Sequence, residues 1–182
     1  MMPASILKPN VAIACGGTGG HLFPGLAVAQ HLLAHDCSVT VLISPKEVDQ
    51  QAIKSARGVD VVTLPAVALQ RGSRLTFLQG FWKSWRASRR RFRSNRPDAV
   101  LAMGGFTSAP PVLAARSRRT KTFLHESNTI PGRANRWLAR MADCAFVGFP
   151  QAESQLRAAR LWDLIRRGRS FWLPAAVRGP VG

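Results

Sequence analysis

The sequence predicts an α/β fold in which helices cover a doubly wound, mostly parallel, Rossmann-like sheet. Short apolar runs alternate with amphipathic stretches of helical length from residue 10 to residue 147. Glycine clusters directly follow two of these runs, as they do in the βα turns of such sheets. The chain has 182 residues, of which 46% are hydrophobic, so it is long enough for one domain with a buried sheet.

Each predicted element follows from a local pattern. The first apolar run is typical of a buried parallel strand, and the helix after it is expected to begin at Pro24, because proline suits a first helical turn. Pro110 and Pro111 indicate another helix start, and Gly80 predicts a break in a long basic helix. The predicted strands are 10–15, 38–43, 60–64, 99–103, 120–125 and 144–147, and the predicted helices are 24–35, 47–57, 76–95, 108–117 and 132–141.

The strand and helix pattern ends near residue 156, so we expect one domain over residues 1–156 and an atypical basic tail over 157–182. The tail holds two tryptophans, six arginines and no strand pattern. We interpret it as the product of a shifted reading frame or a truncation near Arg157, with a linker or partner-docking tail as the alternative. We expect no secretory signal, and the three isolated cysteines favour a reducing compartment over a zinc site or disulfides.

Positive charge is concentrated in one part of the chain. The formal net charge is +17, and residues 71–122 carry thirteen basic residues against one acidic residue, Asp98. Such a block indicates an anionic partner, which is a nucleic acid, a phospholipid surface or a phosphorylated substrate. A nucleic-acid site would need base-stacking aromatic residues or a known module, so we expect no nucleic-acid partner.

The glycine-rich segment 15–21, CGGTGGH, follows the first predicted strand. Glycines allow backbone N–H groups to approach a ligand closely, and a helix N-terminus behind them favours an anion. The spacing matches neither the dinucleotide nor the P-loop pattern, and a tight turn without a ligand is the alternative. His21 lies where open α/β sheets bind ligands, and a neutral imidazole there accepts a proton from a hydroxyl; a capping or core histidine is the alternative.

Four segments in one colinear order carry a more specific signal. They are GGTGGHLFPGLAVAQHL at 16–32, PDAVLAMGGF at 97–106, HESN at 125–128 and NRWLA at 135–139. Over roughly residues 10–156 the chain resembles the MurG family of bacterial N-acetylglucosaminyltransferases. That resemblance implies one half of a GT-B glycosyltransferase, in which two Rossmann-type domains face a cleft and the N-terminal domain holds the lipid acceptor.

The resemblance also implies the reaction and its substrates. Family members transfer GlcNAc, with inversion, from UDP-GlcNAc to the 4-hydroxyl of MurNAc-pentapeptide on undecaprenyl diphosphate, which forms lipid II for peptidoglycan. By resemblance, the residues that contact the donor are Thr18, Gly19, Gly20 and Asn128, and those that contact the acceptor diphosphate are Gly17, Gly104 and Gly105. Asn128 is alternatively a turn residue that bonds its own loop.

An inverting displacement needs a base for the acceptor hydroxyl and positive groups for the leaving diphosphate. His21 is the first candidate for the base and Glu126 the second, and a structural carboxylate is the alternative for Glu126. The family needs no bound metal or other cofactor, and we expect none. Ser127 replaces the usual glutamine, Phe106 stands where tyrosine is common, and the family's domain-junction turn and C-terminal domain are missing.

The segment 75–96 interleaves large apolar residues with cations, as an interfacial helix on anionic lipid does. We expect Phe81, Trp82 and Trp85 to contact the membrane, which suits a peripheral protein on the cytoplasmic face of the inner membrane. An ordinary amphipathic helix on the sheet is the alternative.

We expect the truncated chain alone to be inactive. The rival functions are a non-catalytic, membrane-recruiting subunit of a split glycosyltransferase, a nucleic-acid-binding protein and a glycolipid synthase that uses diacylglycerol.

Overall fold

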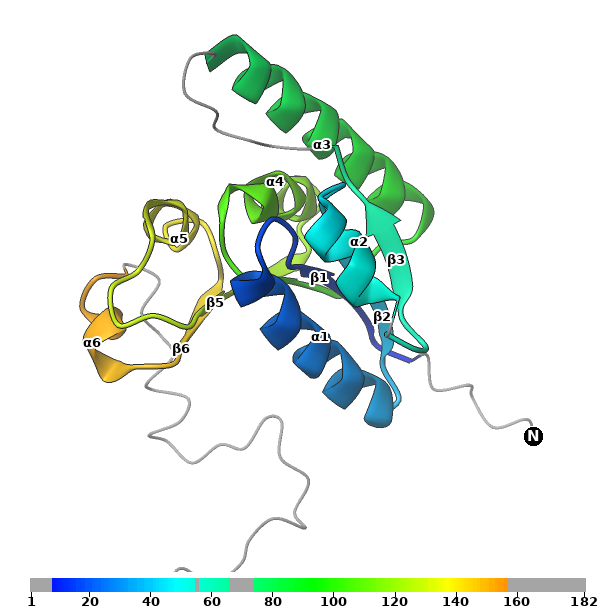
Figure 1. Ribbon diagram of the computed structural model, residues 1–182, viewed down its shortest axis with the longest axis horizontal. Helices are drawn as coiled ribbons and strands as arrows, with labels where there is room; N and C mark the ends of the chain where they lie inside the picture. Colours follow the sequence, from blue (N-terminus) through cyan, green and yellow to red (C-terminus); the bar gives the residue numbers. More distant parts are fainter. Residues whose placement is uncertain (1–7, 55, 66–73, 157–182) are drawn as a thin grey trace, which may run out of the picture.

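The computed structural model describes residues 8–54, 56–65 and 74–156, so the expectations for 157–182 lie outside the described residues. Six parallel strands form one sheet in the order β3-β2-β1-β4-β5-β6 (Figure 1). The strands are β1 Asn10–Ala14, β2 Ser38–Ile43, β3 Asp60–Thr63, β4 Ala99–Ala102, β5 Lys121–Glu126 and β6 Cys144–Val147. These bounds confirm the predicted fold class and place each strand within a residue of its predicted ends.

The helices agree with the predictions less closely than the strands do. They are α1 Gly19–Ala34, α2 Glu47–Ile53, α3 Arg74–Ser94, α4 Ala109–Arg116, α5 Arg133–Leu138 and α6 Pro150–Glu153, with a 3-10 turn, η1, at Phe106–Ser108. The prediction that the first helix begins at Pro24 is wrong, because the Thr18 carbonyl already accepts the N–H groups of His21 and Leu22. The predicted break at Gly80 is also wrong, since α3 continues through it. The packing of one helix face offsets the roughly 1 kcal/mol that a glycine costs there.

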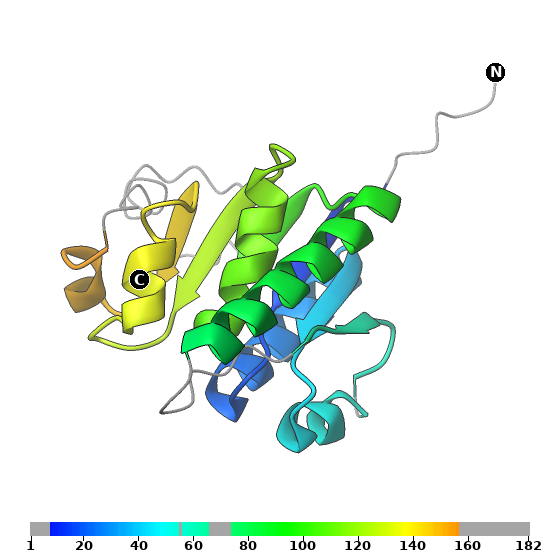
Figure 2. The ribbon, with the colours of Figure 1, turned by 90° about the horizontal axis from the view of Figure 1, so that it is seen from above.

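Handedness decides which face of the sheet each helix covers. Right-handed crossovers place α1 and α2 on one face, because the chain moves from β1 towards β3. The later connections run in the opposite direction along the sheet and place α3, α4 and α5 on the other face (Figure 2). One core cluster packs under α1, and two more pack under α3, α4 and α5.

The face under α1 is covered over only half of the sheet. Side chains of β1 and β2 are buried on both faces, whereas along β4, β5 and β6 the residues that face the α1 side are only half-buried. An open apolar groove of about 500 Å³ lies there, and its lining includes Val28, Leu32, Leu101, Phe123 and Phe146. No helix within the described residues is long and apolar enough to cross a membrane.

Candidate active site

The two glycine loops meet at the carboxyl ends of β1 and β4. These strands are neighbours in the sheet although they are far apart in sequence, and the strand order reverses between them. The Thr107 hydroxyl donates to the Gly16 carbonyl of the first loop. The Ser108 hydroxyl lies 2.9 Å from the Ala14 carbonyl oxygen and 2.7 Å from that of Gly104, so it joins both strand ends. Open α/β sheets bind their ligands at this point of reversal.

The first loop is held from beneath by α2. A Cβ on Gly16 would lie 2.3 Å from the Ser44 backbone nitrogen, so only glycine fits there. Gly17 has a φ of +111° and donates its N–H to Asp49 Oδ2 at 2.7 Å. Asp49 is fully buried, and it also accepts the N–H and hydroxyl of Ser44. The amide that Gly17 would offer to an acceptor diphosphate is therefore already engaged.

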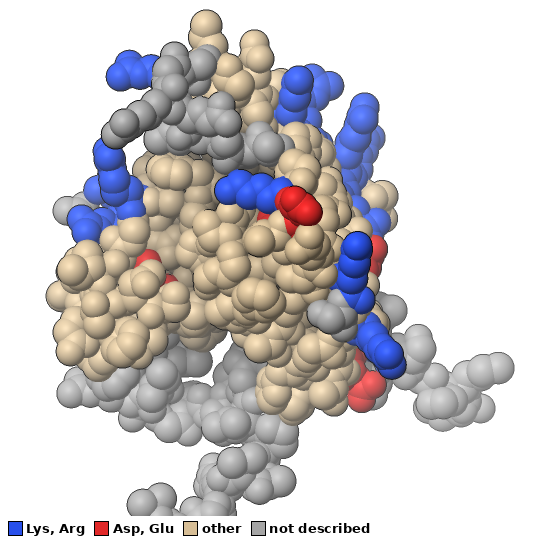
Figure 3. All heavy atoms as spheres, viewed as in Figure 1, with Lys and Arg blue, Asp and Glu red and all other residues tan. Residues whose placement is uncertain are grey.

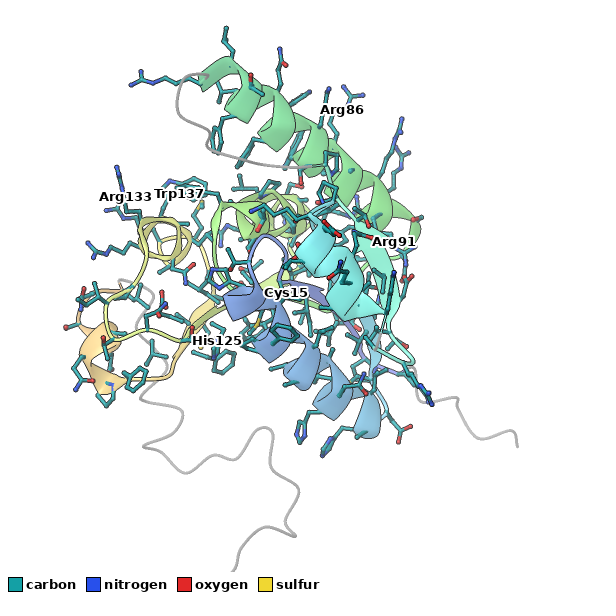
Figure 4. All side chains as sticks on the ribbon, in the orientation of Figure 1. Cys15, Arg86, Arg91, His125, Arg133 and Trp137 are labelled. Carbon is teal, nitrogen blue, oxygen red and sulfur yellow. The ribbon has the colours of Figure 1, made fainter. Side chains whose placement is uncertain are left out.

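Cys15 lies at the end of β1, directly under this loop (Figure 4). A Cβ on Gly25 would lie 2.6 Å from the Cys15 Cβ, so α1 packs closely against the strand end. Burial, followed by the nearby Asp49 carboxylate, raises the pKa of the Cys15 thiol to about 12. A thiol with that pKa stays protonated and is no nucleophile, so Cys15 serves as packing beneath the site.

The first turn of α1 presents uncapped backbone to the surface. Thr18 is the N-cap residue, and its side chain makes no capping hydrogen bond. Thr18 and Gly20 are exposed and Gly19 is half-buried. The first N–H groups of a helix have no intrahelical partner, and together with the helix dipole they favour an anion or a hydroxyl oxygen. Three of the four residues expected to contact the donor thus form one accessible turn.

His21 is half-buried and lies against the second glycine loop. Gly104 and Gly105 both have positive φ, at 114° and 76°. A Cβ on Gly104 would lie 2.9 Å from His21 Cε1, and one on Gly105 would lie 3.5 Å from His21 Nε2. His21 Nδ1 is buried and has no hydrogen-bond partner within the described residues. The fold therefore brings the first candidate base into contact with the loop expected to hold the acceptor diphosphate.

Glu126, the second candidate, is 1% exposed and accepts four hydrogen bonds. Its Oε1 accepts the backbone N–H and side-chain amide of Asn128, at 2.9 and 2.8 Å. Its Oε2 accepts the Gly132 N–H at 3.3 Å and the Asn135 amide at 2.8 Å. This set of donors fixes the loop after β5 and the start of α5. It also shows Asn128 bonded within its own loop, as the turn alternative expects.

Asn135 lies in one of the four motifs, but the motif alone indicates no role for it. Its amide atoms would lie 3.0 and 3.1 Å from a Cβ on Gly104, so Asn135 links Glu126 to the loop that supports His21. His125 lies beside Glu126 at the end of β5 (Figure 4). Burial lowers the pKa of His125, the Glu126 carboxylate partly opposes this, and His21 adds to the lowering. Nothing in the sequence predicts that Asp49 supports the loop, because it lies in a polar stretch without a motif.

The described residues contain no group of three or more His, Cys, Asp or Glu side chains placed to hold a metal ion. Arg133 projects from α5 beside Trp137, which is 42% exposed (Figure 4).

Two of the three residues expected to contact the membrane lie partly against the core. Phe81 and Trp85 are half-buried and pack against core clusters, as the alternative of an ordinary amphipathic helix expects. Trp82 is 53% exposed and stacks on Trp85. Leu75 and Leu78, which were not among the three residues expected to contact the membrane, are 73% and 59% exposed and share a face with Trp82. Basic side chains gather along the same helix (Figure 3).

The fold and the site define a Rossmann-like domain with a candidate ligand site at the point where its strand order reverses. The model of the glycosyltransferase family 28 N-terminal domain matches residues 11–147, so the chain belongs to glycosyltransferase family 28. A Pelobacter propionicus protein named UDP-N-acetylglucosamine--N-acetylmuramyl-(pentapeptide) pyrophosphoryl-undecaprenol N-acetylglucosamine transferase is 41% identical over 143 residues, which cover 76% of this chain and 38% of the relative. A Geobacter sulfurreducens protein of the same name is 39% identical over 80% of this chain and 41% of the relative.

Solved structures agree with this assignment. The crystal structure of Acinetobacter baumannii MurG, a GT-B glycosyltransferase, matches 80% of this chain and 43% of its own chain, with a TM-score of 0.71 and 29% identity. A UDP-N-acetylglucosamine 2-epimerase from Rickettsia bellii matches 83% of this chain and 42% of its own with a TM-score of 0.62, but at 14% identity it shows the fold alone. The chain spans about two fifths of the length of the curated relatives it matches.

Proposed function

We propose that the chain is the acceptor-binding half of an inverting glycosyltransferase that moves GlcNAc from UDP-GlcNAc to lipid-linked MurNAc-pentapeptide and so forms lipid II. The observation that carries this proposal is the half-buried His21 imidazole seated on Gly104 and Gly105 at the strand reversal. The names of the relatives that share this domain supply the substrates.

In the proposed reaction His21 accepts the proton of the MurNAc 4-hydroxyl. The hydroxyl oxygen forms a bond to C1 of GlcNAc as the bond from C1 to UDP breaks, and UDP leaves with the electron pair. The second glycine loop holds the acceptor diphosphate, and the first turn of α1 lies against the donor. Glu126 acts through its hydrogen bonds, because they hold Asn128 and α5 in place.

A fusion tests this proposal directly. Residues 1–156 are joined to the C-terminal half of the Pelobacter propionicus relative, and transfer of labelled GlcNAc to lipid-linked MurNAc-pentapeptide is measured. We expect the fusion to turn over and the chain alone to show negligible activity, because half a cleft cannot position two substrates.

His21→Ala should lower kcat of the fusion by at least about a hundredfold, which is typical for the loss of a general base. His31→Ala, on the exposed end of the same helix, is the matched control. Unchanged turnover in His21→Ala contradicts the mechanism.

We also propose that α3 binds the anionic cytoplasmic face of the inner membrane, where a lipid-linked acceptor resides. Leu75, Leu78 and Trp82 supply the apolar contact, and the cations further along α3 supply attraction of about 1 kcal/mol each. The chain should co-sediment with vesicles that contain anionic lipid, and less so as salt rises. Leu78→Ser with Trp82→Ser should remove the binding that persists at high salt, whereas Val48→Ser, at an exposed valine of α2, should not. Equal binding by both variants contradicts the proposed surface.

A further inference from the structure

Lys46 places an ammonium group on the rim of the first glycine loop. The residue is the N-cap of α2, and its side chain is exposed. Its Nζ donates to the Gly17 carbonyl oxygen at 2.7 Å. Its backbone N–H lies 3.3 Å from the Ser44 hydroxyl oxygen, so both its backbone and its side chain contact the residues that hold the loop.

Buried contacts beneath the loop fix the Gly17 backbone, which this ammonium contacts. Asp49 binds the Gly17 N–H from inside the protein, while Lys46 binds the carbonyl of the same residue from the solvent side. Thr107 holds the preceding carbonyl, that of Gly16. The backbone of Gly17 is therefore held at both its N–H and its carbonyl, and Lys46 binds the residue that directly precedes Thr18, the N-cap of α1.

The ammonium retains capacity for a ligand. It carries three N–H donors, and the bond to Gly17 uses one of them. The ion pairs within residues 8–54, 56–65 and 74–156 are Lys8–Asp36, Arg91–Asp60 and Lys121–Asp143, and Lys46 belongs to none of them. A cation with free donors beside exposed helix N–H groups is a combination that suits a phosphate.

We propose that Lys46 is a further diphosphate-binding residue of this site, one that pairs with phosphate oxygens of a substrate lying on the first turn of α1. The inference rests on the proposed function, in which the donor and the acceptor both carry a diphosphate. Negative charge develops on the diphosphate of the leaving UDP, so a cation there stabilises the transition state more than the ground state.

The chain itself allows the first test. Inorganic pyrophosphate is titrated into the chain, and the amide resonances of Gly19 and Gly20 are followed by NMR. Lys46→Gln keeps a donor for the Gly17 carbonyl but removes the charge, so we expect about fivefold weaker binding at these amides with an unchanged Tm. Lys46→Arg should retain the binding. Lys54→Gln, at the other end of α2, is the matched control for general loss of charge. Equal affinity of Lys46→Gln and the parent chain overturns the inference, and so does an equal loss in Lys54→Gln.

The fusion described above separates this inference from the proposed function. A raised KM for UDP-GlcNAc in Lys46→Gln assigns the contact to the donor diphosphate, and a raised KM for the lipid substrate assigns it to the acceptor. Unchanged kcat and KM values overturn the inference while the proposed function stands. A fusion without any transfer, combined with Lys46-dependent pyrophosphate binding, contradicts the proposed function and supports the binding site.

Discussion

A substitution at Glu126 distinguishes a structural role of its carboxylate from a catalytic one. Glu126→Gln preserves shape but exchanges one carboxylate oxygen for an NH2 group. Each of the two oxygens accepts two hydrogen bonds from the loop and α5, so the new NH2 group faces two donors whichever oxygen it replaces. The substitution therefore sets donors against donors in a site that is 1% exposed.

The cost follows from these contacts. Two hydrogen bonds to a charged group contribute about 1.5–3 kcal/mol each, which gives a loss of about 3–6 kcal/mol. Asn135 reduces that loss if its side-chain amide turns over, because its Oδ1 has no partner within the described residues and would accept from the new NH2 group. We therefore expect the free energy of unfolding to fall by about 2–4 kcal/mol. For a domain of this size that corresponds to a Tm lower by roughly 5–15 °C.

Thermal unfolding of the chain, followed by circular dichroism, measures this effect. Glu47→Gln is the matched control, because Glu47 is exposed on α2. Within the described residues, its carboxylate accepts one side-chain hydrogen bond, from Gln51. We expect the control to unfold within about 1 °C of the parent chain. If Glu126→Gln unfolds at the same temperature as the parent, the carboxylate does not anchor the loop, and Glu126 becomes a candidate base again.

Two further predictions concern the same region. Gly104→Ala should lower the Tm by roughly 5–15 °C, because a Cβ would lie 2.9 Å from His21 and the residue has a φ of +114°. Gly132→Ala is the control, since nothing lies within 4 Å of the added atom, and it should leave the Tm within a few degrees of the parent value. A similar Tm for both variants would contradict the close approach of His21 to Gly104. Burial holds the pKa of His125 below its ordinary 6.5, so the unfolded chain takes up a proton on this residue more readily than the folded protein does. The effect of His125 on stability should therefore be absent well above pH 6.5, and it should lower stability as the pH falls through 6.5. Urea unfolding at pH 7.5 and pH 5.5 measures how the free energy of unfolding changes with pH. His125→Gln should reduce this change. An equal change in both proteins would show that another group causes it.

The strands were predictable because a buried parallel strand appears in the sequence as a short run of mostly apolar residues. Runs such as NVAIA at 10–14 and SVTVLI at 38–43 are mostly apolar on both faces, as expected of a strand that is covered on both sides. The helix starts were less predictable. The start of α1 depends on the Thr18 carbonyl and two glycines, whereas propensity alone points to Pro24.

The site was predictable only in part, and the reason lies in how its residues are held. The glycine loops and His21 stand in recognisable motifs at strand ends, so their meeting at β1 and β4 followed from the topology. Asp49 and Lys46 come from α2, which has no glycine pattern. Their contacts with Gly17 arise from the packing of that short helix against the loop, which no sequence period encodes.

The buried polar atoms that lack a partner support the assignment of the site independently of any motif. Within the described residues they are His21 Nδ1, Asp49 Oδ1, Asn135 Oδ1, Ser84 Oγ and Arg118 Nε. The first three surround the two glycine loops. An unpaired buried polar atom costs about 1–3 kcal/mol, so a fold shaped by stability alone would not gather three of them in one place. Local rules for a stable fold fail most often at functional sites.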